Sequence, residues 1–186
     1  NTFSGNVGIG NAYGVIKMNH PNALGQGIAT ARISLYGTVD VNGHDLPTRW
    51  LSSNNGSGYL GAGMLINSAE GTTSEVNGYW INGTTPGTMF GGGGNIIMTS
   101  YISGGNPVVK VGTGDLTFSG QNAATNNTFV RGGTLIWDYT AQNVDKLLDG
   151  RKLYLNQGRL RMVGNNSAPT VEQMGDLDAQ TEANRV

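Results

Sequence analysis

The sequence predicts an all-β protein built as a β-solenoid, in which short strands stack in successive coils. Glycine supplies 31 of the 186 residues, and glycine favours tight turns over helix interiors. Short runs of alternating apolar residues recur between these glycines, and their apolar side chains would point to one face of a strand. Strands this short suit coils that stack at the ~4.8 Å spacing of paired strands.

The alternating runs recur along residues 1–186, which we treat as a single solenoid segment. They occupy residues 33–43, 108–120, 129–137 and 153–164. Alternation predicts an inward-facing set of apolar residues: Val39, Val41, Leu116, Phe118, Leu135, Leu153, Leu155 and Leu160. At ~20–25 residues per coil, the chain would make roughly eight coils.

The turns leave some alternatives open. Asn-Gly pairs begin at residues 42, 55, 77 and 82 and favour type I′ turns, so some hairpins are expected to protrude, mainly between 42 and 95. Residues 144–150 fit either one helical turn closed by Gly150 or a tight corner between coils. A β-sandwich is the competing architecture, but it prefers longer strands at regular spacing.

Composition and charge exclude several classes of protein. The 11 basic and 12 acidic residues give a formal net charge of −1, which leaves no basic excess for binding nucleic acid. Cysteine is absent, so no disulfide or thiolate metal site can form. No apolar run approaches the ~18 residues that span a bilayer, so we expect no membrane insertion of this segment. The chain opens at Asn1 without a visible signal peptide, which predicts a processed chain or an excised piece.

Several segments carry a recurring pattern. Residues 109–120 read V-K-V-G-T-G-D-L-T-F-S-G, residues 1–5 read N-T-F-S-G, and residues 21–25 contain N-A-L-G. Residues 39–43 read V-D-V-N-G, and residues 135–160 combine L-I-W-D-Y, K-L, L-Y-L and G-R-L. In this order the segments resemble the autotransporter-associated β-strand repeats of bacterial surface proteins, whose signature is K-x-G-x-G-x-L-x-L-S-G.

The resemblance implies a right-handed parallel β-helix that is exported and displayed at the bacterial cell surface. It implies no catalytic residues, and the family's functions are adhesion, biofilm formation and acting as a stalk. The sequence departs from the family pattern at Trp137, which replaces an aliphatic residue, and at Asn156-Gln157-Gly158, which replaces a Gly-Gly turn. The glycine run at 91–94 also makes one turn unusually flexible. Our leading hypothesis is a non-enzymatic extracellular stalk, adhesin or fibre segment.

A carbohydrate-binding module on the same solenoid is the second hypothesis. Trp50, Tyr59, Tyr79, Trp80 and Tyr101 could form an aromatic surface on which sugars stack. In alternating strands about half of such residues would face the core instead. The partners of this surface would be host or biofilm glycans.

A glycan-cleaving enzyme is the third hypothesis, because many β-helices cleave polysaccharides. Such a hydrolase needs two carboxylates roughly 5–10 Å apart. Most carboxylates are scattered along the chain, although Asp176 and Asp178 have the spacing that puts two residues on one strand face. His20 and His44 are predicted to lie in turns, and no nucleophile is tied to either by spacing.

We expect no metal or cofactor. Asp115 follows a G-x-G step that resembles part of a calcium-binding repeat, but the step occurs once and lacks the nine-residue period. The glycine-rich segments at 8–10 and 91–94 lack the further residues that dinucleotide and phosphate loops require.

The ends of the sequence predict self-association or continuation. A solenoid leaves unpaired strand edges at both ends and normally blunts them with polar caps. Residues 1–5 begin inside a repeat pattern, and residues 182–186 contain no proline or charge run. We expect either further coils of the same polypeptide or identical subunits stacked end to end, a contact that would grow into a filament.

Overall fold

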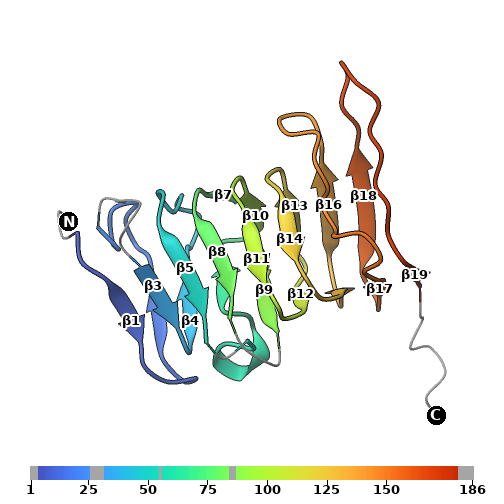
Figure 1. Ribbon diagram of the computed structural model, residues 1–186. Coiled ribbons are helices and arrows are strands. Elements are labelled where there is room, and N and C mark those ends of the chain that lie inside the picture. Colours follow the sequence, from blue (N-terminus) through green and yellow to red (C-terminus); the bar gives the residue numbers. More distant parts are fainter. Residues whose placement is uncertain (1–3, 26–31, 55, 84–86, 180–186) are drawn as a thin grey trace, which may run out of the picture.

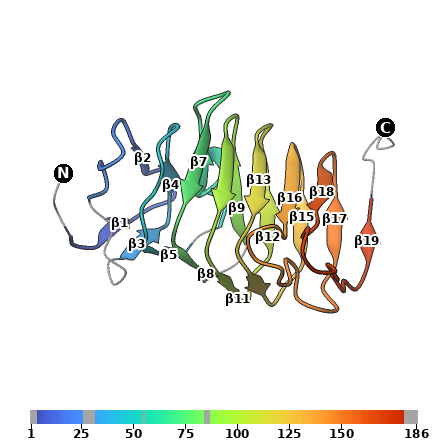
Figure 2. The same ribbon diagram turned by 90° about the horizontal axis from the view of Figure 1, so that it is seen from above.

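Stacked coils form the whole of the described chain. The computed structural model describes residues 4–25, 32–54, 56–83 and 87–179, which form an all-β solenoid of about seven turns with almost no helix. Successive strands lie side by side from the N-terminal to the C-terminal end (Figure 1). Viewed from above, the coils stack along one axis (Figure 2). The predicted fold class is confirmed.

The strands belong to three parallel sheets, which we name A, B and C. Sheet A contains β1 (Val7–Ile9), β3 (Arg32–Leu35), β5 (Trp50–Ser53), β8 (Tyr79–Asn82), β11 (Ile102–Gly104) and β14 (Asn122–Ala124). Sheet B contains β2 (Val15–Lys17), β4 (Thr38–Asp40), β6 (Leu65–Asn67), β9 (Thr88–Gly92), β12 (Val108–Lys110), β15 (Thr128–Val130), β17 (Leu153–Leu155) and β19 (Leu177–Asp178). Sheet C contains β7 (Thr73–Val76), β10 (Asn95–Met98), β13 (Asp115–Phe118), β16 (Thr134–Asp138) and β18 (Arg159–Val163).

Parallel pairing fixes which residues stack on one another. The distance along the chain between stacked residues ranges from 18 residues, between Arg32 and Trp50, to 29 residues, between Trp50 and Tyr79. The longer coil contains an excursion with one 3-10 turn, Tyr59–Gly61. Excursions therefore leave the stack between strands without disturbing the register of the sheets.

Sheet C is shorter than the other two because the chain crosses its N-terminal edge without forming a strand. The Leu46 backbone N–H donates to the backbone carbonyl of Glu75 at 2.8 Å, and the Asn77 N–H donates to the Leu46 carbonyl at 3.1 Å. The C-terminal edge of sheet A, at β14, is covered in a similar way, since the Asn122 N–H donates to the Asp145 carbonyl at 3.3 Å.

The core is a set of columns of apolar side chains, one column for each inward position. In sheet C, Leu116 stacks on Leu135, and Phe118 stacks on Trp137. All four side chains are buried. The predicted core residues Val39, Val41, Leu116, Phe118, Leu135 and Leu153 are confirmed as buried.

Leu155 and Leu160 are only partly buried, although both pack against the core. Leu160 lies in β18, the last strand of sheet C, and Leu155 lies in β17, which is followed in sheet B only by the short β19. Their inward direction was predicted correctly, but fewer coils cover them.

Two expectations about the turns are resolved by the structure. The hairpins expected between residues 42 and 95 are wrong for the described part of the chain, because every strand pair there is parallel and Asn42-Gly43 and Asn77-Gly78 lie at coil corners. Residues 144–150 contain no helix. Residues 145 and 146 run along the edge of β14, and a turn follows in which the Arg151 N–H donates to the Leu148 carbonyl at 3.0 Å. The N-T-F step at residues 1–3 lies outside the described residues.

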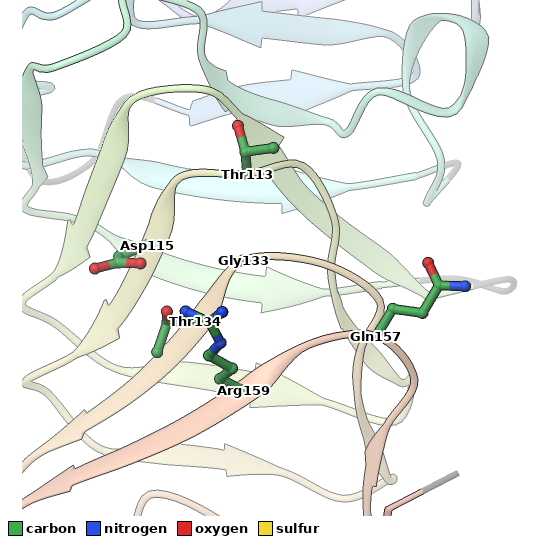
Figure 3. Close-up of a pocket in the computed structure, with 6 residues that line it drawn as sticks. All are labelled: Thr113, Asp115, Gly133, Thr134, Gln157 and Arg159. Atoms are coloured by element: carbon green, nitrogen blue, oxygen red, sulfur yellow. The ribbon is translucent and has the colours of Figure 1, made fainter. Parts of the chain in front are cut away.

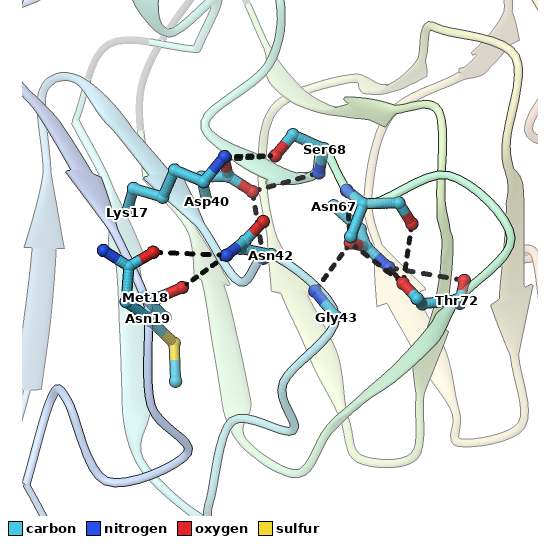
Figure 4. A network of polar contacts seen from close by, with 10 residues as sticks. Lys17, Met18, Asn19, Asp40, Asn42, Gly43, Asn67, Ser68 and Thr72 are labelled. Carbon is cyan, nitrogen blue, oxygen red and sulfur yellow. Dashed lines mark hydrogen bonds and ion pairs between the residues drawn. The ribbon is translucent and has the colours of Figure 1, made fainter.

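The turns that lead from sheet B to sheet C are named the B–C corner. Polar side chains at the ends of the sheet B strands bind the backbone of these turns. Asp40 ends β4, and its carboxylate accepts bonds from the backbone N–H groups of Asn42 and Ser68, each at 3.0 Å. Asn67 ends β6; its amide oxygen accepts from the Gly43 N–H at 2.9 Å and its amide nitrogen donates to the Asn95 carbonyl at 3.0 Å. Figure 4 shows both side chains joining adjacent coils.

Two buried lysines perform the same task, Lys110 at the B–C corner of a later coil and Lys146 between sheets C and A. Lys110 ends β12, and its ammonium donates to the carbonyls of Val111, Gly112 and Gly132 at 2.6, 3.0 and 3.2 Å. Lys146 donates to the carbonyls of residues 119, 120 and 142 at 2.8, 2.9 and 3.0 Å. Burial lowers the pKa of each lysine to about 8. Each ammonium thus satisfies carbonyls from more than one segment.

Replacing Phe118 by Ala should destabilise the fold, since it empties the column between Met98 and Trp137. We expect a loss of about 3–5 kcal/mol in the free energy of unfolding. Urea denaturation measures it, with the outward-facing Thr117→Ala as the matched control, expected to change stability by under ~0.5 kcal/mol. Equal effects of the two variants would show that the register is wrong.

Replacing Lys110 by Met should also destabilise, because it keeps an apolar stem but leaves buried carbonyls without their donor. The loss expected is about 1–3 kcal/mol for each carbonyl left unsatisfied, less where water reaches it. Lys152→Met is the control, since Lys152 is exposed at the surface and its ion pair with Asp176, at 2.6 Å, is screened by solvent. A Lys110→Met variant as stable as wild type would contradict the role of the ammonium.

The two buried lysines also set a pH dependence. Their pKa is about 8 in the folded chain against 10.5 ordinarily, so between these values the unfolded chain binds more protons. The free energy of unfolding should therefore rise with pH across this window. Urea midpoints at pH 7.5 and 10, compared between wild type and Lys110→Met, measure the effect. A wild type that loses stability relative to the variant as the pH rises would reverse the predicted sign.

Candidate functional surfaces

An aromatic ladder lies on the outer face of sheet A. Trp50 pairs with Tyr79 in the sheet, and Tyr101 directly precedes β11 in the next coil. The ring centroids of Trp50 and Tyr79, and of Tyr79 and Tyr101, are both 5.1 Å apart. Arg32 lies over the Trp50 ring at 5.3 Å and extends the ladder by one coil. The ladder thus spans successive coils along the axis.

The rings of the ladder cover one another. The Tyr79 and Tyr101 rings are stacked with an interplanar angle of 20°. The Ser103 hydroxyl donates to the Tyr79 hydroxyl at 3.1 Å, which fixes the edge of that ring. Ring faces that contact each other stabilise the stack of coils. The surface available to a ligand therefore consists mainly of ring edges and polar ring atoms.

Two of the predicted sugar-stacking residues lie outside this ladder. Trp80 is fully buried and packs against Phe90 at a centroid distance of 4.9 Å, so its prediction as a surface residue is wrong. Adjacent residues of a strand point to opposite faces, so Tyr79 and Trp80 cannot share a surface. Tyr59 is exposed, but it lies in the excursion between β5 and β6. The structure brings together Trp50, Tyr79 and Tyr101.

A polar pocket of about 300 Å³ lies at the B–C corner near the C-terminal end of the described chain. Its lining residues are Thr113, Asp115, Gly133, Thr134, Gln157 and Arg159. Figure 3 shows them on three successive coils. Asp115, Thr134 and Arg159 stack directly on one another in sheet C, so the parallel register assembles the pocket from three separate segments. We name this site the corner pocket.

Charges of both signs face the corner pocket. Within the described part of the chain, the side chains of Asp115 and Arg159 form no ion pair. The Lys110 ammonium lies behind the pocket, because a Cβ added to Gly133 would lie 2.9 Å from Lys110 Nζ. Burial lowers the pKa of Lys110, and the nearby Asp115 carboxylate raises it by a smaller amount.

Other predicted candidates have structural roles. Asp176 pairs with Lys152, and Asp178 lies in β19. His20 lies in a turn, where its Nδ1 accepts a bond from the Asn22 N–H at 3.1 Å. His44 lies in another turn.

Among the described residues, no group of three or more His, Cys, Asp or Glu side chains could hold a metal ion. In the same part of the chain, no helix is long and apolar enough to cross a membrane.

Comparison of the chain with protein-family models, curated proteins and solved structures found no match.

The corner pocket was missed by sequence reasoning. Of its lining residues, sequence reasoning singled out Asp115, as part of a calcium-like motif, and Gln157, in a turn that departs from the family pattern. The signal that could have found the pocket is the coil register, which places Thr134 and Arg159 at distances of 19 and 25 residues from their stacked neighbours. These unequal distances are not apparent before the coil lengths are known.

Gln157 adopts a backbone conformation that costs stability. Its φ is 67°, in the left-handed region that favours glycine. The register places Gly132 at this position in the preceding coil. A non-glycine residue there costs roughly 1–2 kcal/mol. Gln157→Gly should therefore raise the free energy of unfolding by about 1 kcal/mol, measured by urea denaturation. Gln157→Ala retains the Cβ and should leave the free energy of unfolding unchanged. An equal increase in both variants would show that the side chain beyond Cβ, and not the backbone conformation, destabilises the fold.

Proposed function

We propose that the chain is a non-enzymatic structural segment of an extracellular bacterial surface protein, acting as a stalk, an adhesin or part of a fibre. The observation that carries this proposal is the unbroken stack of coils, in which three parallel sheets share one apolar core. Backbone pairing along the axis makes such a stack stiff and extended. The repeat pattern of residues 109–120 supports export and surface display.

Self-association belongs to the same proposal. Within the described strands, terminal strands such as β1 of sheet A and β18 of sheet C pair with one neighbouring strand only. An open strand edge is a template for another strand. Further coils of the same polypeptide or a second copy would both complete it.

Immunogold labelling of intact native cells, with antibodies against this chain, tests surface display. We expect label on unpermeabilised cells, with a cytoplasmic protein as the unlabelled control. Label that appears only after permeabilisation would reject the extracellular role.

Sedimentation velocity of the isolated chain tests self-association. We expect species larger than the 19.5 kDa monomer that grow with concentration. A stable monomer at high concentration, with terminal strand amides protected from hydrogen exchange, would reject end-to-end stacking of copies.

Carbohydrate binding is a second candidate, favoured by the aromatic ladder. Trp50 is 37% exposed, and the ladder offers aromatic edges with a guanidinium at one end. Aromatic residues with a polar atom suit surfaces that are partly apolar and partly wet. A glycan lying along the solenoid axis would contact successive rings.

A glycan array tests this candidate with wild type and Tyr101→Ala. We expect bound glycans to be lost in the variant, because Tyr101 ends the ladder. Tyr154→Ala is the matched control, since Tyr154 stacks on Phe129 at 4.7 Å on sheet B. Equal losses in both variants would reject the ladder as the binding surface, and new reducing ends in the bound glycan would indicate an enzyme instead.

A further inference from the structure

The corner pocket combines features that the stacking of coils does not require. Asp115 and Arg159 belong to the outer face of sheet C, so neither contributes to the apolar core. Thr134 lies between them in the same column. Opposite charges separated by one strand are held about 9–10 Å apart at the backbone, given the spacing of paired strands. A small ligand fits between groups held at that separation.

Bare backbone forms one wall of the pocket. Gly133 has a φ of 60°, and a Cβ there would meet both the Gly114 carbonyl and Lys110 Nζ. No side chain can therefore fill this space from Gly133. The buried ammonium of Lys110 adds positive charge directly behind the wall.

Arg159 and Asp115 line the pocket with one charge of each sign. The Lys110 ammonium lies behind the Gly133 wall, where it donates to the carbonyls of residues 111, 112 and 132. The Arg159 guanidinium presents donors in a fork that matches a carboxylate. Asp115 in turn requires a hydrogen-bond donor from the ligand, such as a hydroxyl group.

The remaining lining selects for hydroxyl groups. Three lining side chains can each donate and accept hydrogen bonds: Thr113, Thr134 and Gln157. No aromatic or aliphatic side chain lines the pocket, so an apolar ligand would find no matching surface. A volume of about 300 Å³ lies at the lower end of the range for ligand pockets, which suits a single sugar-sized molecule.

Gln157 gives independent support. Its side chain is present at a position of positive φ, which favours glycine, and the register places Gly132 there in the preceding coil. A strained residue at a pocket is a reason to consider a functional role for its side chain. Gln157 lines one side of the pocket, and in Figure 3 its amide points away from Asp115, Thr134 and Arg159.

We propose that the corner pocket binds a small polyhydroxylated carboxylate, such as a uronic acid unit. The carboxylate would bind Arg159, and the hydroxyl groups would bind Asp115 and Thr134. This site is separate from the aromatic ladder and does not depend on the proposed structural role.

The test is a titration of the 15N-labelled chain with sodium D-glucuronate, followed by two-dimensional amide NMR spectra. D-glucose and sodium acetate are the matched ligands, since each carries one half of the proposed chemistry. We expect saturable shifts at Gly133, Thr134 and Gln157 with glucuronate. Binding of glucose and acetate should be at least about tenfold weaker, as expected for the loss of a charge-assisted contact or of several hydroxyl contacts.

Variants assign the binding to the pocket. Arg159→Gln should weaken glucuronate binding at least about tenfold. Arg161→Gln is the matched control, because Arg161 is the next outward residue on β18 and does not line the pocket. The spectra themselves report whether each variant is folded.

Four results would overturn the proposal. Absence of saturable shifts with glucuronate would reject the site. Equal affinity for acetate would reduce it to a general anion contact, and equal affinity for glucose would remove the role of the carboxylate. Equal weakening by Arg159→Gln and Arg161→Gln would assign the effect to overall surface charge.

Discussion

Parallel pairing between coils is the constraint on which the rest of the structure depends. It places each residue directly over its counterpart one coil away, so a side chain must suit the residues above and below it. The column of Phe90, Lys110 and Val130 illustrates the rule and its limit. Lys110 fits among apolar neighbours because its stem is apolar and its ammonium reaches carbonyls at the corner. A polar group is tolerated inside the stack where the turn supplies its partners.

The corners are where the solenoid differs from a simple sheet. Turns carry backbone groups that the strand ladders do not pair, and burying such groups without partners is costly. Asp40 and Asn67 accept from backbone N–H groups, whereas Lys110 and Lys146 donate to carbonyls. The side chain at a corner is therefore matched to the backbone group that needs a partner. These contacts link the coils in a chain that has no cysteine.

Sequence reasoning succeeded where the information is local and failed where it depends on register. Alternation within a strand predicted that Leu116 and Phe118 face the core. It did not predict that Lys110 is buried, because lysine is usually exposed and the compensating carbonyls include one from the next coil. The corner pocket was not predictable, since coils of unequal length determine that Asp115 and Arg159 share a column.

The two candidate surfaces differ in what they contribute to the fold. The rings of the aromatic ladder contact one another, so Tyr79 and Tyr101 stabilise the stack whether or not a ligand binds. Their presence therefore has a sufficient structural explanation. Gln157 instead destabilises the fold, because its backbone has a positive φ, which glycine adopts without strain. A side chain kept at a cost to stability calls for an explanation outside the fold, and among the two surfaces the corner pocket supplies one.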